Sequence, residues 1–249
     1  MHSVQQEPVA IVGIGCRFPG AENPQAFWSL LREGRSAIRE VPSTRWKPDA
    51  LRPFGLTYPE KPVSRWGGFL DAIDTFDWNA FRILPREVKF MDPQHRLLLE
   101  VAWEAFEDAG IPFDSIAGSR TGVFMGLIWH DYLHLQARNW SRLDAYTATG
   151  NASSFAANRL SYFFDLKGPS LSLDAGCSSS LASVYLACQC LWSGEAELAL
   201  AGGVNLMLSP DTMIMVSKTG MLSSDGSIRV LDAQADGFVR GEGAGIVVL

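Results

Sequence analysis

This chain of 249 residues lacks the features that would direct it to a membrane or to nucleic acid. No apolar run reaches the roughly 18 residues that suggest a membrane span. Residues 1–7 lack the charged and apolar regions of a signal peptide. No basic stripe is visible and the formal net charge is -6, which argues against a nucleic-acid partner. These absences predict a cytoplasmic protein.

Cysteine and histidine are scarce, with four residues of each type. The cysteines show neither metal-ligand spacing nor the pattern of a disulfide framework, and reduced thiols are expected: Cys16, Cys177, Cys188 and Cys190. His130 and His134 lie four residues apart beside Asp131, a spacing that can indicate a metal pair. No third ligand is evident nearby, so a polar loop or helix is the preferred interpretation. We therefore expect no metal and no bound cofactor.

The hydrophobic pattern predicts alternating strands and helices. Asn23-Pro24 and Asp92-Pro93 provide helix N-caps followed by proline, and Gly34 and Gly110 end these helices. The expected strands are 8–14, 121–128, 170–173, 197–208 and 237–249, and the other expected helices are 152–164 and 178–192. This order predicts an α/β fold with a mainly parallel sheet.

Three local features qualify this prediction. Gly13 and Gly15 resemble part of a dinucleotide fingerprint, but Phe18 stands where a third glycine is needed, so no such site is expected. Residues 40–62 are rich in proline and predict a long loop. The last residues, Ile-Val-Val-Leu, have no turn or cap. Domains seldom end inside an apolar strand, so we expect that the chain is cut there.

Cys177 is the main candidate for chemistry. It follows the small residues Ala175 and Gly176, which allow a sharp turn between a short strand and the next helix. The unpaired N–H groups and the dipole at a helix N-terminus stabilise a thiolate by about 0.3–1 kcal/mol, and the thiolate is the nucleophile. From this context alone a packing role for Cys177 stays equally open, since free cysteine is among the most buried residue types. We expect packing roles for the other three cysteines, with Cys16 in a turn.

The segment DAGCSSSLASVYLACQCL resembles the active-site segment of ketosynthases, and EPVAIVGIGCRFPGA resembles their opening strand and turn. Further blocks match in family order: FWSLLREG, MDPQHRLLLEVAWEAFEDAGI, TGVFMG, ANRLSYFFDLKGPS, AGGVNLMLSP, KTGMLSSDG and ADGFVRGEGAGIVVL. The resemblance covers nearly the whole chain and is closest to modular type I polyketide synthases, with animal-type fatty acid synthases next. Residues 1–249 are thereby identified as a β-ketoacyl synthase N-terminal domain.

The resemblance implies the N-terminal half of a thiolase-like fold, with a five-stranded sheet between helices. It also implies that Cys177 accepts an acyl group from an acyl carrier protein, and that its N–H donates to the oxyanion. Decarboxylative Claisen condensation with a malonyl-type extender follows in the complete domain. Leu127 and Ile128 would lie near the acyl pocket. The implied partners are the acyl carrier protein and its phosphopantetheine, the C-terminal half, a second copy in a homodimer, and a neighbouring acyltransferase domain.

The sequence departs from the family pattern in two places. Ala175-Gly176 replaces the usual Thr-Ala before the cysteine. The two histidines that the family needs downstream of the cysteine are absent, since every histidine precedes Cys177, so this chain alone should not condense. Structural roles are expected for Asn158, Arg159 and the cluster 240–243. A coenzyme A-dependent thiolase and a non-catalytic docking scaffold remain the alternatives, although inactive relatives usually lack the cysteine.

Overall fold

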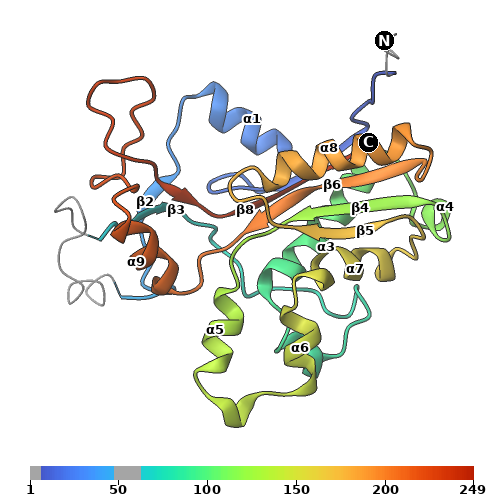
Figure 1. Ribbon diagram of the computed structural model, residues 1–249, viewed down its shortest axis with the longest axis horizontal. Helices are drawn as coiled ribbons and strands as arrows, with labels where there is room; N and C mark the ends of the chain where they lie inside the picture. The colour runs from blue at the N-terminus through green and yellow to red at the C-terminus, as the bar shows by residue number, and fades with distance from the viewer. Residues whose placement is uncertain (1–6, 48–62) are drawn as a thin grey trace.

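The computed structural model describes residues 7–47 and 63–249, and part of the predicted proline-rich loop lies outside these ranges. At its centre is a five-stranded sheet in the order β1-β8-β6-β4-β5 (Figure 1). Its strands are β1 (Gly13–Arg17), β4 (Thr121–Gly126), β5 (Ser170–Leu173), β6 (Leu198–Asn205) and β8 (Gly243–Val248). β4 runs parallel to β5 and β6, whereas β8 runs antiparallel to β6 and β1. The predicted α/β architecture is confirmed, with a mixed sheet.

Helices cover both faces of this sheet. α3 (Pro93–Asp108) and α7 (Ser154–Phe163) lie on one face, and α8 (Ser179–Trp192) lies on the other (Figure 1). β4 shows the two faces directly, because Val123 packs in the core on the side of α3 and α7 while its neighbour Phe124 packs with α8. Such alternation follows from the period of two along a strand. Within the two described ranges, no helix is long and apolar enough to cross a membrane.

The predicted helix caps are confirmed. α1 (Pro24–Arg32) begins after Asn23, whose side chain accepts a hydrogen bond from Ala26 N at 2.8 Å. α3 begins after Asp92, which accepts from Gln94 N at 2.8 Å. Both helices carry proline at their first position, where its missing N–H leaves no hydrogen bond unmade.

The remaining elements surround the sheet. A smaller sheet of order β2-β3-β7 contains β2 (Ile38–Glu40), β3 (Trp66–Gly68) and β7 (Arg240–Gly241). The short helices are α2 (Pro85–Val88), α4 (Phe113–Ile116), α5 (Asp131–Ala137), α6 (Ala145–Asn151) and α9 (Pro210–Lys218), with a 3₁₀ turn at Trp140–Arg142.

The prediction for the first strand was wrong in position and in burial. The strand begins at Gly13 rather than Pro8, so Cys16 lies within it and not in a turn. Its outward residue Ile14 is 42% exposed, because α3 covers only one face of this strand. A Cβ atom at Gly13 would lie 2.3 Å from the carbonyl oxygen of Ala105. The glycine therefore permits close approach of β1 to α3, and no cofactor is needed to explain it.

Candidate active site

Cys177 lies in a tight turn between β5 and α8, two residues before the first helical residue. Gly176 adopts a φ of 62°, a left-handed conformation that suits glycine. The Asp174 side chain accepts a hydrogen bond from Gly176 N at 2.9 Å. The sharp turn predicted from the small residues before the cysteine is therefore present.

Two serines fix this turn on the side of α8. Ser178 Oγ donates to the carbonyl oxygen of Ala175 at 2.8 Å. Ser179 Oγ donates to the carbonyl oxygen of Gly176 at 2.6 Å and accepts from Ala175 N at 2.9 Å. Ser179 is buried, so these hydrogen bonds are shielded from water. The consecutive serines after the cysteine thus stabilise the turn that contains the nucleophile.

The Cys177 side chain faces a groove of about 600 Å³. Cys177 itself is exposed, whereas Leu127 is buried and Ile128 is half-buried. All three line the groove, so the structure brings together the residues that the sequence proposed as a site. Trp129 and Phe18 also line it, and sequence reasoning did not single them out for this place.

Burial distinguishes Cys177 from the other thiols. Cys16 and Cys190 are 3% and 6% exposed, and burial raises the pKa of both thiols. Cys188 is half-buried and packs in the cluster between α8 and the sheet. A raised pKa lowers the thiolate fraction, so Cys16 and Cys190 suit packing better than catalysis, as does the packed Cys188.

Two glycines bring α8 close to the sheet below the turn. A Cβ atom at Gly126 would lie 2.7 Å from the Cβ atom of Ser179. One at Gly203 would lie 3.1 Å from the Cβ atom of Ser180. Any side chain at Gly126 would push the start of α8, and with it Cys177, away from β4.

Glu242 lines the groove and connects segments that surround it. Its carboxylate accepts hydrogen bonds from Leu70 N at 2.8 Å and Met207 N at 2.9 Å, and it pairs with Arg45 at 3.2 Å. Arg240 is buried with its guanidinium 5.6 Å from the centre of the Trp129 ring. Burial lowers the pKa of Arg240, while Asp131 and Glu242 oppose that shift. These contacts agree with the structural role predicted for the cluster 240–243.

The segment after β6 is held by two further buried side chains. Gln94 Oε1 accepts from Leu206 N at 3.2 Å. Asp131 accepts from Leu208 N at 3.0 Å and Ser209 N at 3.1 Å. Asp131 was noticed in the sequence only as a neighbour of two histidines, and nothing local indicated this role.

Asn158 contacts β5, as predicted, whereas Arg159 contacts α2 and α6. Asn158 Oδ1 accepts a hydrogen bond from Ser170 Oγ at 2.8 Å, at the start of the strand. Arg159 pairs with Glu87 at 2.7 Å. Asn158 therefore helps to fix the strand that leads to Cys177, and Arg159 connects α7 to α2 and α6.

No histidine of the described ranges lines the groove. His95 lies in α3 with 1% exposure, and burial together with nearby Arg159 lowers its pKa to about 3. His130 Nε2 lies 3.3 Å from Ser153 Oγ. Over the residues whose positions are described, no three His, Cys, Asp or Glu side chains are placed to hold a metal ion. Among the residues that the structure describes, the groove therefore offers a nucleophile without a histidine partner.

Comparison with known sequences gives consistent matches. Residues 6–249 match the family model described as "Beta-ketoacyl synthase, N-terminal domain". The chain is 52% identical over 245 residues to a phenolphthiocerol/phthiocerol polyketide synthase of Mycobacterium tuberculosis, covering 98% of this chain and 16% of that protein. It is 51% identical over 248 residues to another phenolphthiocerol/phthiocerol polyketide synthase, from Mycobacterium bovis, covering 98% of this chain and 11% of that protein. The chain thus spans a small part of these relatives.

Solved structures show the same fold. The ketosynthase from module 6 of the bacillaene synthase from Bacillus subtilis 168 matches with a TM-score of 0.85 and 39% identity, over 96% of this chain and 39% of that one. The oxazolomycin ketosynthase domain KS7 from Streptomyces albus JA3453 matches with a TM-score of 0.88 and 38% identity, over 97% of this chain and 43% of that one.

Proposed function

Because the chain belongs to the β-ketoacyl synthase family, as the N-terminal half of a ketosynthase of the modular polyketide synthase type, we propose that it carries the acyl-accepting nucleophile of that enzyme. The observation that carries the proposal is the position of Cys177. It is exposed in a groove at the start of α8, while Cys16 and Cys190 are buried. A coenzyme A-dependent thiolase is not supported, since the matching relatives and structures are polyketide synthases and their ketosynthases.

The first step is a transfer between two thioesters. The Cys177 thiolate attacks the acyl carbonyl carbon, and the bond between that carbon and the phosphopantetheine sulfur breaks. The acyl group remains on Cys177 Sγ, and the released thiolate takes up a proton. The Cys177 N–H, beside the N-terminus of α8, would donate a hydrogen bond to the oxyanion. Removal of one such donor from an enzyme costs about 2.7–4 kcal/mol of transition-state stabilisation.

Condensation needs groups beyond this chain. Decarboxylation of a malonyl-type extender yields carbon dioxide and a carbanion, which attacks the acyl-enzyme carbonyl and displaces Cys177 as thiolate. The histidines that support this step in the family have no counterpart in the groove. The chain covers 39–43% of the matched ketosynthases. We infer that a C-terminal half supplies these groups and that this half alone does not condense.

The groove and the sheet edge suggest the remaining partners. Leu127 and Ile128 would contact the acyl chain, since both line the groove beside Cys177. An acyl carrier protein would deliver the substrate, and an acyltransferase domain would load that carrier. β5 ends the order of the five-stranded sheet, so it would pair with the same strand of a second copy in a homodimer. The cytoplasm is the expected location.

A cerulenin-type thiol probe tests the nucleophile assignment. The chain is incubated with the probe, and labelled peptides are quantified by mass spectrometry. We expect labelling at Cys177 to exceed that at Cys16, Cys188 and Cys190, because only the first thiol is exposed in the groove.

Cys177→Ala should remove this label, whereas Cys188→Ala should retain it. Equal labelling of all four cysteines of the folded chain would contradict the proposal.

A further inference from the structure

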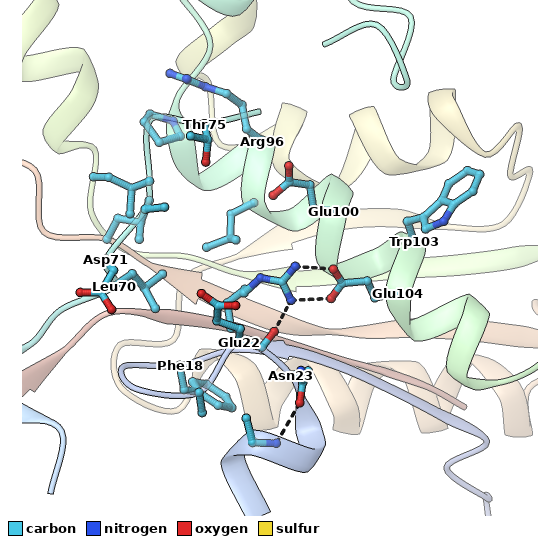
Figure 2. A pocket seen from close by; sticks show the side chains of 18 of the residues that line it. Phe18, Glu22, Asn23, Leu70, Asp71, Thr75, Arg96, Glu100, Trp103 and Glu104 are labelled. Carbon is cyan, nitrogen blue, oxygen red and sulfur yellow. Dashed lines mark hydrogen bonds and ion pairs between the residues drawn. The ribbon is translucent and has the colours of Figure 1, made fainter. Parts of the chain in front are cut away.

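Phe18 lies between the Cys177 groove and a second cavity of about 800 Å³. That cavity is bounded by the turn before α1, the loop of residues 70–81 and α3, and Phe18 lies at its rim (Figure 2). Its volume falls in the usual range of about 300–1,000 Å³ for ligand sites. Among the residues that the structure describes, Phe18 alone lines both the cavity and the groove. One aromatic side chain is therefore the boundary that the two spaces share.

The Phe18 ring lies on two glycines of β8. A Cβ atom at Gly243 would lie 2.6 Å from Phe18 Cδ1, and one at Gly245 would lie 3.3 Å from Phe18 Cζ. These glycines alternate along the strand, so they present the same face to the ring. The ring also packs on Phe27, with ring centres 4.7 Å apart. The glycines at the start of β8 therefore provide the space that this ring occupies.

The backbone of Phe18 is held as well. Phe18 N donates to the carbonyl oxygen of Ala21 at 2.8 Å, and Ala21 N donates to the carbonyl oxygen of Phe18 at 2.9 Å. The preceding residue, Arg17, pairs with Glu104 of α3 (Figure 2). A residue that is anchored in its ring and in its backbone suits a fixed wall.

An open path leads from Cys177 to Phe18 along the groove. α8 begins over β4 and β6, since a Cβ atom at Gly203 of β6 would lie 3.1 Å from the Cβ atom of Ser180. Phe18 lies over β8, the neighbour of β6 in the sheet. Gly203 and Gly245 pair across these two strands and line the groove. Because neither residue carries a side chain, the floor between the thiol and the Phe18 ring stays open.

The second cavity combines paired charges with apolar surface. Arg17 donates to the Glu104 carboxylate from both terminal nitrogens. Burial raises the pKa of Glu100, whereas the nearby Arg17 and Arg96 oppose that shift. Apolar lining comes from other segments: Leu70, Ile73 and Leu206. Since the guanidinium groups and the carboxylates face one another, a neutral chain fits this cavity better than an ion.

We propose that Phe18 limits the length of the acyl group that Cys177 accepts, by closing the groove against the second cavity. This inference rests on the proposed function, because it concerns the acyl group in the Cys177 groove. In the wild-type chain the acyl group ends at the Phe18 ring. With a smaller side chain at this position, the second cavity extends the groove and accommodates the end of a longer chain.

The test compares two thiol-reactive probes, N-butyl and N-decyl chloroacetamide, which differ only in the length of the alkyl tail. Rate constants for labelling of Cys177 are measured by mass spectrometry, and the ratio of the decyl to the butyl rate is compared among variants. Phe18→Ala should raise this ratio roughly tenfold, at the lower end of the discrimination that an apolar pocket shows for one methylene. Phe238→Ala is the matched control, because that ring lines the groove but not the second cavity, and it should leave the ratio unchanged.

The buried thiols detect a folding effect. Cys16 and Cys190 are 3% and 6% exposed, so both would be labelled if Phe18→Ala unfolded the chain. Phe18→Leu then decides, and it should raise the ratio in the same direction by a smaller factor. An unchanged ratio in the folded variants, or an equal rise in Phe238→Ala, would overturn the proposal. A Cys177 thiol that neither probe labels would overturn it too.

The same probes separate this inference from the proposed function, because alkylation of a thiol needs no acyl transfer. Transfer of an acyl group from a pantetheine thioester to Cys177, together with an unchanged ratio, would contradict the role of Phe18 and leave the proposed function intact. A raised ratio without acyl transfer would support Phe18 as the boundary and contradict the proposed function.

Discussion

At the scale of single residues, the buried carboxylate of Glu242 joins distant segments of the chain at the groove that contains Cys177. Glu242 holds Leu70 and Met207, which lie 172 and 35 residues away in the sequence, and it neutralises Arg45. These partners explain why sequence reasoning identified the cluster 240–243 but could not identify its contacts. No local pattern links a glutamate to an amide so far along the chain.

We predict that Glu242→Gln destabilises the chain by roughly 3 kcal/mol, because it leaves Arg45 buried without its counter-charge. Urea unfolding at neutral pH measures this change. Glu197→Gln is the matched control, since its pair with Arg120 is exposed on both sides and should change stability by less than about 1 kcal/mol. Equal effects of the two substitutions would contradict the assigned role of Glu242.

At the scale of elements, the first turn of α3 contains two buried titratable groups with opposite effects on stability. Burial raises the pKa of Asp92 to about 6, although Gln94 opposes the shift. The stability that Asp92 contributes is present below about pH 3.9 and is lost as the pH rises through about 6. Burial lowers the pKa of His95 to about 3. Its contribution is present above about pH 6.5 and is lost as the pH falls through about 3.

We therefore predict that the effects of Asp92 and His95 on the free energy of unfolding nearly cancel between about pH 4 and 6. Each group alone would change this free energy by about 1.4 kcal/mol per pH unit, in opposite directions. Unfolding free energies of the wild type, Asp92→Asn and His95→Gln are measured across this range. Relative to the wild type, Asp92→Asn should become more stable as the pH rises, and His95→Gln should become less stable. If the free energies of unfolding of the three proteins change with pH in parallel, the pKa values of Asp92 and His95 are not shifted as described.

The contact of α8 with β4 gives a second prediction for an element. Gly126→Ala should destabilise the chain by about 1–3 kcal/mol and slow probe labelling of Cys177, because the new methyl group would meet the backbone of Ser179. Gly241→Ala is the control, since it lines the same groove and a Cβ atom there has open space. Unfolding and labelling rates measure both effects. An unchanged labelling rate in Gly126→Ala would show that the Cys177 turn does not depend on this contact.

Elements were predictable where their signals are local. The caps of α1 and α3, the extent of β5 and the turn at Gly176 all depend on neighbouring residues. The position and burial of β1 were not predictable, because its burial depends on α3 covering one face and leaving Ile14 exposed on the other. The turn before Cys177 allowed this residue to be proposed as the nucleophile, and the resemblance to ketosynthases supported that prediction. The groove around it is built from segments far apart in the sequence.

At the scale of the whole molecule, the chain leaves an apolar surface uncovered on α8. Leu181 and Tyr185, four residues apart on one helix face, are 72% and 60% exposed. Exposed apolar patches of this kind mark interaction surfaces. In a complete ketosynthase we expect the C-terminal half to cover this face.

We predict that the isolated chain self-associates with increasing concentration, as measured by sedimentation velocity. Leu181→Lys combined with Tyr185→Lys should shift the chain toward monomer, because the charges make contact between apolar faces unfavourable. Tyr162→Lys is a control on an exposed aromatic residue of α7. A wild-type chain that stays monomeric at all concentrations would contradict this prediction.

The most direct test of the account is acyl transfer to Cys177 itself. The chain is incubated with an acyl-pantetheine thioester, and its intact mass and peptides are determined by mass spectrometry. We predict the addition of one acyl group, located on Cys177 and absent in Cys177→Ala. An acyl group on Cys188 or another residue, or an equal mass increase in Cys177→Ala, would contradict the claim that this groove holds the nucleophile.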